Sequence, residues 1–202
     1  MKYEKKIKQL LYAIIGNCVM GAGVAMGTQA LIGMDPSVSF SQAASIKLGI
    51  SFGTMVTITN IVLLVITFFI AKKNIGIATL MVVLLNQYPI DFVTSLITHS
   101  NSLIINILWV IAGCVFVAIG CNIIVASDLG MGIYDALIYG ICSKVNKGYS
   151  FVRYFVDGTF LVLTFLLDGY IGIGTIIPYI ITGRLVELTM PIIKKIFVLD
   201  QK

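Results

Sequence analysis

The sequence repeats itself in order, and this internal duplication limits what the chain can fold into. Glycines spaced alike in two apolar stretches recur at a constant offset, as Gly16 and Gly23 and then Gly113 and Gly120. Later in each half, Ile-Gly-Ile-Ala-Thr at 75–79 returns as Ile-Gly-Ile-Gly-Thr at 171–175. We therefore predict two copies of one structural unit, and we expect the repeated glycines to bring the first helices of the two copies close together.

The composition indicates that each unit is a group of membrane helices. Apolar residues make up 58% of the chain, charged residues only 11%, and the mean hydropathy is +1.02. A helix that crosses about 30 Å of hydrocarbon needs about 20 residues. Six apolar stretches near that length are predicted as spans, at 10–32, 51–71, 75–98, 103–126, 150–167 and 171–193.

The number of spans in each copy predicts how the copies are oriented. Each copy holds three spans, and because three is odd, the second copy enters the membrane from the opposite side. Such inverted repeats are a known plan for transporters. The predicted fold is therefore an all-α membrane protein with six transmembrane helices as two inverted three-helix repeats. It forms a single membrane domain over 1–202, with repeat 1 at about 10–98 and repeat 2 at about 103–197.

Two longer connections occupy the same place in each copy. The segments 36–49 and 132–147 mix apolar residues with serines and charged residues. Pro36 is suited to the first turn of a helix, and Asp35 precedes it as a candidate cap. We expect a short amphipathic helix after the first span of each copy, although a plain surface loop stays open.

The basic residues predict the orientation. Of the fourteen lysines and arginines, all but Lys47 and Arg184 fall at or near cytoplasmic helix ends if the N-terminus is cytoplasmic. The expected location is the bacterial cytoplasmic membrane, as a multi-pass protein with cytoplasmic N- and C-termini.

Short glycine motifs resemble those of a known family. They are Gly-Met-Asp-Pro at 33–36, Gly-Met-Gly-Ile-Tyr-Asp at 130–135, and Ile-Gly-Ile-Gly-Thr at 171–175 followed by Thr-Gly-Arg-Leu-Val-Glu at 182–187. Together they resemble the YczE/YyaS/YitT group of bacterial integral membrane proteins, over about 10–197. The Met-Asp-Pro-Ser turn at 34–37 and Arg184 depart from the expected pattern. The resemblance implies a cytoplasmic-membrane protein and no particular activity.

Ionisable residues inside the spans need partners or water, because an unpaired charge in a membrane costs several kcal/mol. One hypothesis places Arg184 in a hydrated cavity, where it attracts an anionic group and is neutralised by Asp157 or Glu187 when the cavity is empty. The simpler alternative is that Arg153 pairs with Asp157 and Arg184 pairs with Glu187 to hold two helices together. Both alternatives stay open from the sequence.

Three amides of the first copy are predicted at middle depth. Asn17, Asn60 and Asn86 each lie on a different span and offer a donor and an acceptor. They suit either interhelical hydrogen bonds or the lining of a polar site. Asp91 and its counterpart Glu187 lie near opposite ends of corresponding helices, so Asp91 is a candidate gating residue as well as an ordinary helix-end acid.

Motifs for other chemistries are missing from the sequence. No GxxxxGK[ST] nucleotide loop is present, the four cysteines form no CxxC, and His99 is the single histidine. The sequence therefore predicts no enzyme, no cofactor, no metal site and no nucleic-acid partner.

The function predicted from these features is a carrier or channel for a small polar solute, anionic solutes included. The alternatives are a non-transporting membrane scaffold or regulator, and a substrate-capturing subunit of a multicomponent importer. The expected partners are the lipid bilayer and a small polar solute, with a homodimer or a partner membrane protein also open.

Overall fold

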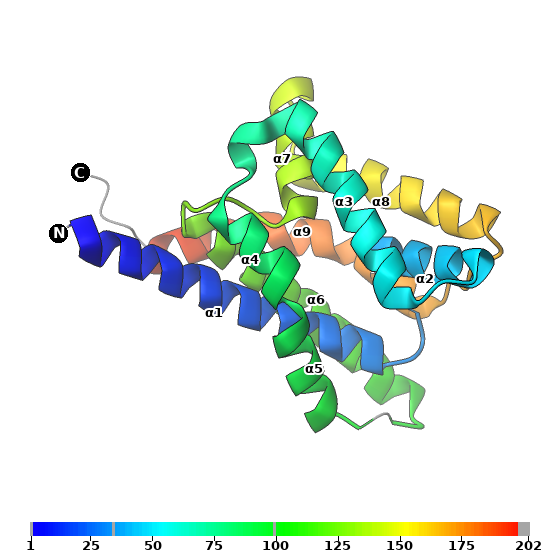
Figure 1. Cartoon of the computed structure of the whole chain (residues 1–202). Helices are drawn as coiled ribbons and strands as arrows, with labels where there is room; N and C mark the ends of the chain where they lie inside the picture. The colour runs from blue at the N-terminus through cyan, green and yellow to red at the C-terminus, as the bar shows by residue number, and fades with distance from the viewer. Residues whose placement is uncertain (1, 34, 99, 198–202) are drawn as a thin grey trace.

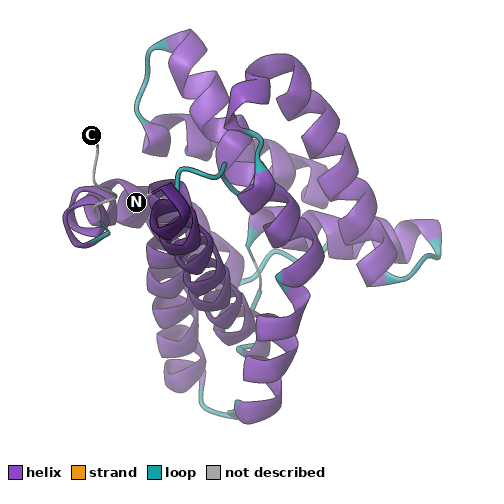
Figure 2. Cartoon of the chain, turned by 60° about the vertical axis from the view of Figure 1, so that its left-hand side comes forward, coloured by secondary structure: helices purple, strands orange, loops and turns teal. Residues whose placement is uncertain are grey.

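The computed structural model describes residues 2–33, 35–98 and 100–197, so the predicted position of His99 lies outside the described residues. Within those ranges the chain forms helices and loops and no strand (Figure 2). The helices, labelled in Figure 1, are α1 (Lys2–Gln29), α2 (Pro36–Leu48), α3 (Phe52–Ala71), α4 (Ile77–Leu85), α5 (Gln87–Leu96), α6 (Leu103–Ala126), α7 (Ile133–Val145), α8 (Tyr149–Leu166) and α9 (Ile173–Ile196), with a 3-10 turn at Lys72–Asn74.

Five helices in the described part of the chain are long and apolar enough to cross a membrane. These are α1, α3, α6, α8 and α9. The short helices α4 and α5 pass the same test only as a pair, which is bent by 41° at the break between them. The all-helical membrane fold is confirmed: five of the six predicted spans are single helices, and the stretch predicted at 75–98 is the bent pair α4–α5.

The stretch predicted as one span at 75–98 forms a bent pair of helices, and Pro89 explains the break. A proline ring clashes with the carbonyl four residues before it and offers that carbonyl no N–H. Four residues before Pro89 is Leu85, which is the last residue of α4. The chain bends at Asn86 and resumes as α5, so a proline inside an apolar stretch marks a bend that hydropathy alone does not show.

The helices α1 and α6 lie side by side at the centre of the bundle (Figure 1). Gly16 faces the backbone of Gly120, and Gly23 faces the backbone of Gly113. A Cβ added to Gly120 would lie 2.4 Å from the backbone nitrogen of Met20, a distance that real Cβ atoms essentially never show. The predicted close approach of the first helices of the two copies is confirmed.

The two short helices are present where the sequence predicts them, and each runs beside half of a longer helix. α2 follows the later part of α8, since Phe40 packs on Phe160 with ring centroids 5.5 Å apart and Lys47 pairs with Asp168 at 3.0 Å. α7 follows the later part of α3, with Gly140 against Ala71.

The start of α2 is fixed by its cap. Asp35 is the N-cap residue, its carboxylate accepts a hydrogen bond from the backbone N–H of Ser37, and Pro36 occupies the first turn. α7 begins after Gly132, which has no side chain to cap it. Both beginnings contact the same segment of α8, because Asp35 reaches Arg153 and Tyr134 reaches Asp157.

The turns before the two short helices make matching contacts with the opposite half of the chain. The Ile32 carbonyl accepts a hydrogen bond from Gly174 N at 2.8 Å, and the Leu129 carbonyl accepts one from Ala78 N at 2.9 Å. Each turn is thus tied to the start of the last helix of the other half.

We predict that Gly120→Ala lowers the free energy of unfolding by about 1–3 kcal/mol, because the new methyl group must separate two backbones. Thermal unfolding of the purified protein in detergent measures the change. Gly27→Ala on α1 is the matched control, since nothing lies within 4 Å of its added Cβ. A Gly120→Ala protein as stable as the wild type would contradict the role given to this contact.

Candidate functional site

Arg153 lies at the centre of a buried polar network on α8. Its Nε donates to Asp157 Oδ2 at 3.2 Å, its Nη1 donates to Tyr149 Oη at 3.0 Å, and its Nη2 donates to Asp35 Oδ2 at 3.4 Å. The guanidinium also stacks over the ring of Tyr134, 5.3 Å from its centroid. One planar cation therefore joins the beginning of α2 to the first half of α8.

Two tyrosines extend this network to α7. The Tyr134 hydroxyl donates to Asp157 Oδ1, and the Tyr149 hydroxyl donates to Asp135 Oδ1 at 2.5 Å. Tyr149 accepts from Arg153 while it donates to Asp135, so its hydroxyl serves both groups. We call the six residues the Arg153 network: Asp35, Tyr134, Asp135, Tyr149, Arg153 and Asp157.

The network is buried and carries more negative than positive charge. Arg153 and Asp135 are each 4% exposed and Asp157 is 0% exposed. The side chain of Asp35 is 30% exposed, which makes it the most accessible of the three carboxylates. Three carboxylates face one guanidinium, and the N-termini of α2 and α7 add roughly half a positive charge each. The site therefore favours a cation or a proton-donating group over an anion.

Arg153 pairs with Asp157, as one of the two alternatives from the sequence predicts. Arg184 and Asp157 lie in different parts of the bundle. The side chain of Arg184 is 69% exposed and lies 3.9 Å from Glu187. Both line a 260 Å³ pocket at the start of α8, where Glu187 accepts a hydrogen bond from Ser150 N at 2.8 Å. Binding of a solute at Arg184 and Glu187 stays a prediction.

The predicted amides are divided between two places. Asn17 is 4% exposed on α1, and Asn86 lies at the break between α4 and α5. Asn60 is half-buried on α3, which packs against α2 and α7 instead. Asp91 is exposed on α5. Their roles in binding and gating stay predictions.

Comparison with known proteins places this fold in a family. The family described as "Family of unknown function (DUF6198)" matches residues 7–191. The chain belongs to this family.

Relatives of this DUF6198 protein include two from Bacillus subtilis (strain 168). "Uncharacterized protein YyaS" is 25% identical, over 93% of this chain and 94% of the relative. "Uncharacterized membrane protein YczE" is 26% identical, over 95% and 89%. An "Uncharacterized protein" of Haemophilus influenzae is 22% identical, over 95% and 86%. No solved structure matches. The resemblance to the YczE/YyaS group is confirmed, and the DUF6198 protein is an integral membrane protein.

Five of the six members of the Arg153 network in this DUF6198 protein were not identified as site residues from the sequence. Arg153 was considered only as the ion-pair partner of Asp157, and the other four are Asp35, Tyr134, Asp135 and Tyr149. Two of them could have been identified from their positions, since Asp35 and Asp135 both follow closely on the repeated Gly-Met pair. Only the fold shows that these two turns face the same segment of α8.

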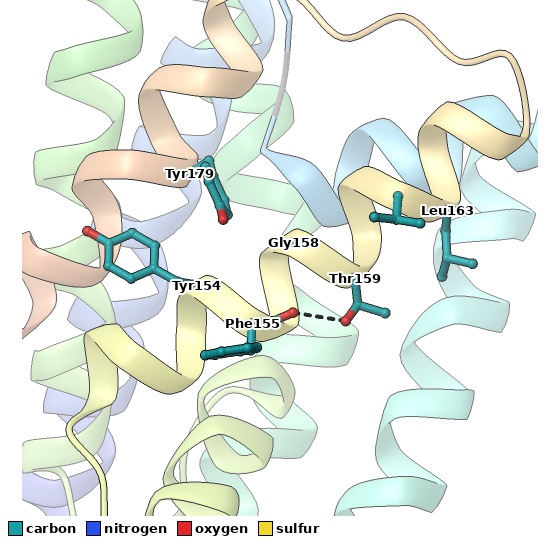
Figure 3. Close-up of a pocket in the computed structure, with 7 residues that line it drawn as sticks. Tyr154, Phe155, Gly158, Thr159, Leu163 and Tyr179 are labelled. Atoms are coloured by element: carbon teal, nitrogen blue, oxygen red, sulfur yellow. Dashed lines mark hydrogen bonds between the residues drawn. The ribbon is translucent and has the colours of Figure 1, made fainter.

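A different feature is a groove of about 550 Å³ between α8 and α9 (Figure 3). Two of its three hydroxyl groups are already used: the Tyr154 hydroxyl donates to Ile180 O at 2.7 Å, and the Thr159 hydroxyl donates to Phe155 O at 2.9 Å. The third hydroxyl is that of Tyr179, the rest of the lining is mostly aromatic and aliphatic, and no charged residue is among it. This groove is therefore mostly apolar and offers a solute no charged group.

We predict that Arg153→Ala lowers the free energy of unfolding by about 3–5 kcal/mol, because it leaves buried carboxylates without their cation. The measurement is equilibrium unfolding in detergent. Arg184→Ala is the control and should change stability by less than about 1 kcal/mol, since that side chain is mostly exposed. Equal effects of the two substitutions would show that the Arg153 network does not hold the bundle together.

Proposed function

We propose that this protein is a carrier or channel for a small polar solute, and that the Arg153 network is its binding site. The observation that carries the proposal is a buried set of charged side chains shared by α2, α7 and α8. Its charge balance supports a cationic or proton-donating solute at this site. The protein would act as a multi-pass component of the bacterial cytoplasmic membrane, with both termini cytoplasmic.

A purely structural role explains this network poorly. A buried ion pair adds little stability compared with apolar side chains of the same volume, because both charges must be removed from water. Ionisable residues inside membrane helices therefore mark solute or proton pathways by default. Asp35 supports this interpretation, since it combines partial exposure with the longest contact to Arg153, at 3.4 Å. Its contact with Arg153 is therefore the one that a solute could replace with the least rearrangement of the network.

The arrangement of the helices supports a carrier built from two inverted repeats. The turns at Ile32 and Leu129 make matching hydrogen bonds, and the glycine contacts between α1 and α6 are reciprocal. α2 and α7 have 13 residues each, fewer than the 18 of α8 and the 20 of α3 beside them, and their N-termini approach one segment of α8. Broken or short helices that end near a central polar site are typical of secondary transporters.

Cysteine accessibility tests this proposal without knowledge of the solute. Ser37 hydrogen-bonds Asp35 in the first turn of α2, so Ser37→Cys places a thiol beside the network. The variant is made after the four native cysteines are replaced by alanine. A membrane-impermeant thiol reagent is then added to right-side-out and to inside-out vesicles. We expect labelling from both sides, because a carrier exposes its site to each side in turn.

Two controls establish the sidedness of the vesicles. Lys47→Cys and Lys144→Cys should each be labelled from one side only, and from opposite sides. Labelling of Ser37→Cys from a single side would contradict a carrier or channel and favour a scaffold that does not transport.

A further inference from the structure

A second polar site lies on the other side of the bundle, where α1 runs beside α4 and α5. Two contacts fix the register of these helices. The side-chain oxygen of Asn86 lies 3.1 Å from the Cβ position of Gly21, and Gln29 donates to the Thr94 carbonyl at 3.3 Å. The same spacing places Asn17 level with Val82, one helical turn before Asn86. Asn17 lies one turn before Gly21 on the same face of α1, so Asn17 and Asn86 belong to facing sides of these helices.

The side-chain oxygens of Asn17 and Asn86 are both buried, and neither accepts a hydrogen bond. Asn17 is 4% exposed. Buried polar atoms almost always have a partner, so an unpaired one indicates a missing water or ion. Here two residues with unpaired oxygens lie about one helical turn apart in the register of facing helices.

The break between α4 and α5 adds a third oxygen. Pro89 has no N–H, so the Leu85 carbonyl lacks the donor that a continuous helix would supply. This carbonyl also belongs to the C-terminal end of α4, where the helix dipole is negative. Interrupted helices in transporters bind monovalent cations with such carbonyls.

The chemistry of these three oxygens indicates which kind of ligand they would bind. All three groups are neutral oxygen acceptors, and Asp91, the acid on α5, is exposed. Calcium and magnesium sites in proteins are built around carboxylates, which these three groups do not include. We infer that Asn17, Asn86 and the carbonyl of Leu85 form a binding site for a monovalent metal cation, with Na+ as the probe. This inference does not depend on the proposed transport.

Equilibrium binding of radiolabelled Na+ to the purified protein in detergent tests the site, with choline chloride holding the ionic strength constant. We expect saturable binding by the wild type. Asn17→Ala and Asn86→Ala should each weaken it by about tenfold or more, which corresponds to about 1.4 kcal/mol for the loss of one oxygen ligand. Asn17→Asp keeps the oxygen and the shape of the side chain and should retain binding, so a loss confined to the alanine variants separates ligation from misfolding.

Asn106→Ala is the matched control. Asn106 is also 4% exposed with an unpaired side-chain oxygen, but it lies on α6 and its amide donates to Ser100 O at 2.9 Å. It should bind Na+ like the wild type. The inference is overturned if the monodisperse wild type binds no Na+. Water would then be the partner of the Asn17 and Asn86 oxygens. The inference is also overturned if Asn17→Ala and Asn86→Ala bind as tightly as the wild type. Neither result changes the cysteine labelling at Ser37, so the two proposals fail separately.

Discussion

The contact between α1 and α6 is the constraint on which the rest of the bundle depends. In a membrane, helices gain little from hiding apolar surface, because lipid tails are equally apolar, and close packing of backbones replaces that gain. Gly16 and Gly23 meet Gly120 and Gly113 without a side chain between them. With this pair fixed, α9 packs on α6 and the α4–α5 pair packs on α1. The helices α2 and α8 pack in turn against α9.

The short helices α2 and α7 follow from this arrangement. Each leaves the end of a central helix through a glycine with positive φ, at Gly33 and Gly130, where any Cβ would be strained. Each turn then hydrogen-bonds to the start of the last helix of the other half. The short helices therefore begin inside the bundle, and their first residues meet the charged part of α8. The Arg153 network is a product of these turns as much as of α8 itself.

Most of the fold could be predicted because its signals are visible in the sequence. Span length and the cap at Asp35 act locally, and the glycine repeat is visible as a pattern although its contact joins α1 to α6. The third predicted span carries a break that its apolar length does not reveal, because the effect of Pro89 on a helix is separate from hydropathy. The site was only partly predictable. Asp157 and its pairing with Arg153 follow from helix spacing, whereas the contacts of Asp35 and Asp135 join residues far apart in the sequence, and burial of Arg184 was inferred from depth alone.

The two halves of the molecule differ chemically at corresponding places. Counting from the Ser-Phe pair that begins α3 and recurs in α8, Arg153 and Asp157 correspond to Thr54 and Ile58. The polar network thus has no equivalent on α3, whose contact with α7 is made by apolar residues such as Leu63 and Ile133. Two conformations related by exchange of the halves would differ in energy, because the second half supplies five of the six residues of the Arg153 network and the first half supplies only Asp35. The protein at rest would then populate one of them in preference to the other.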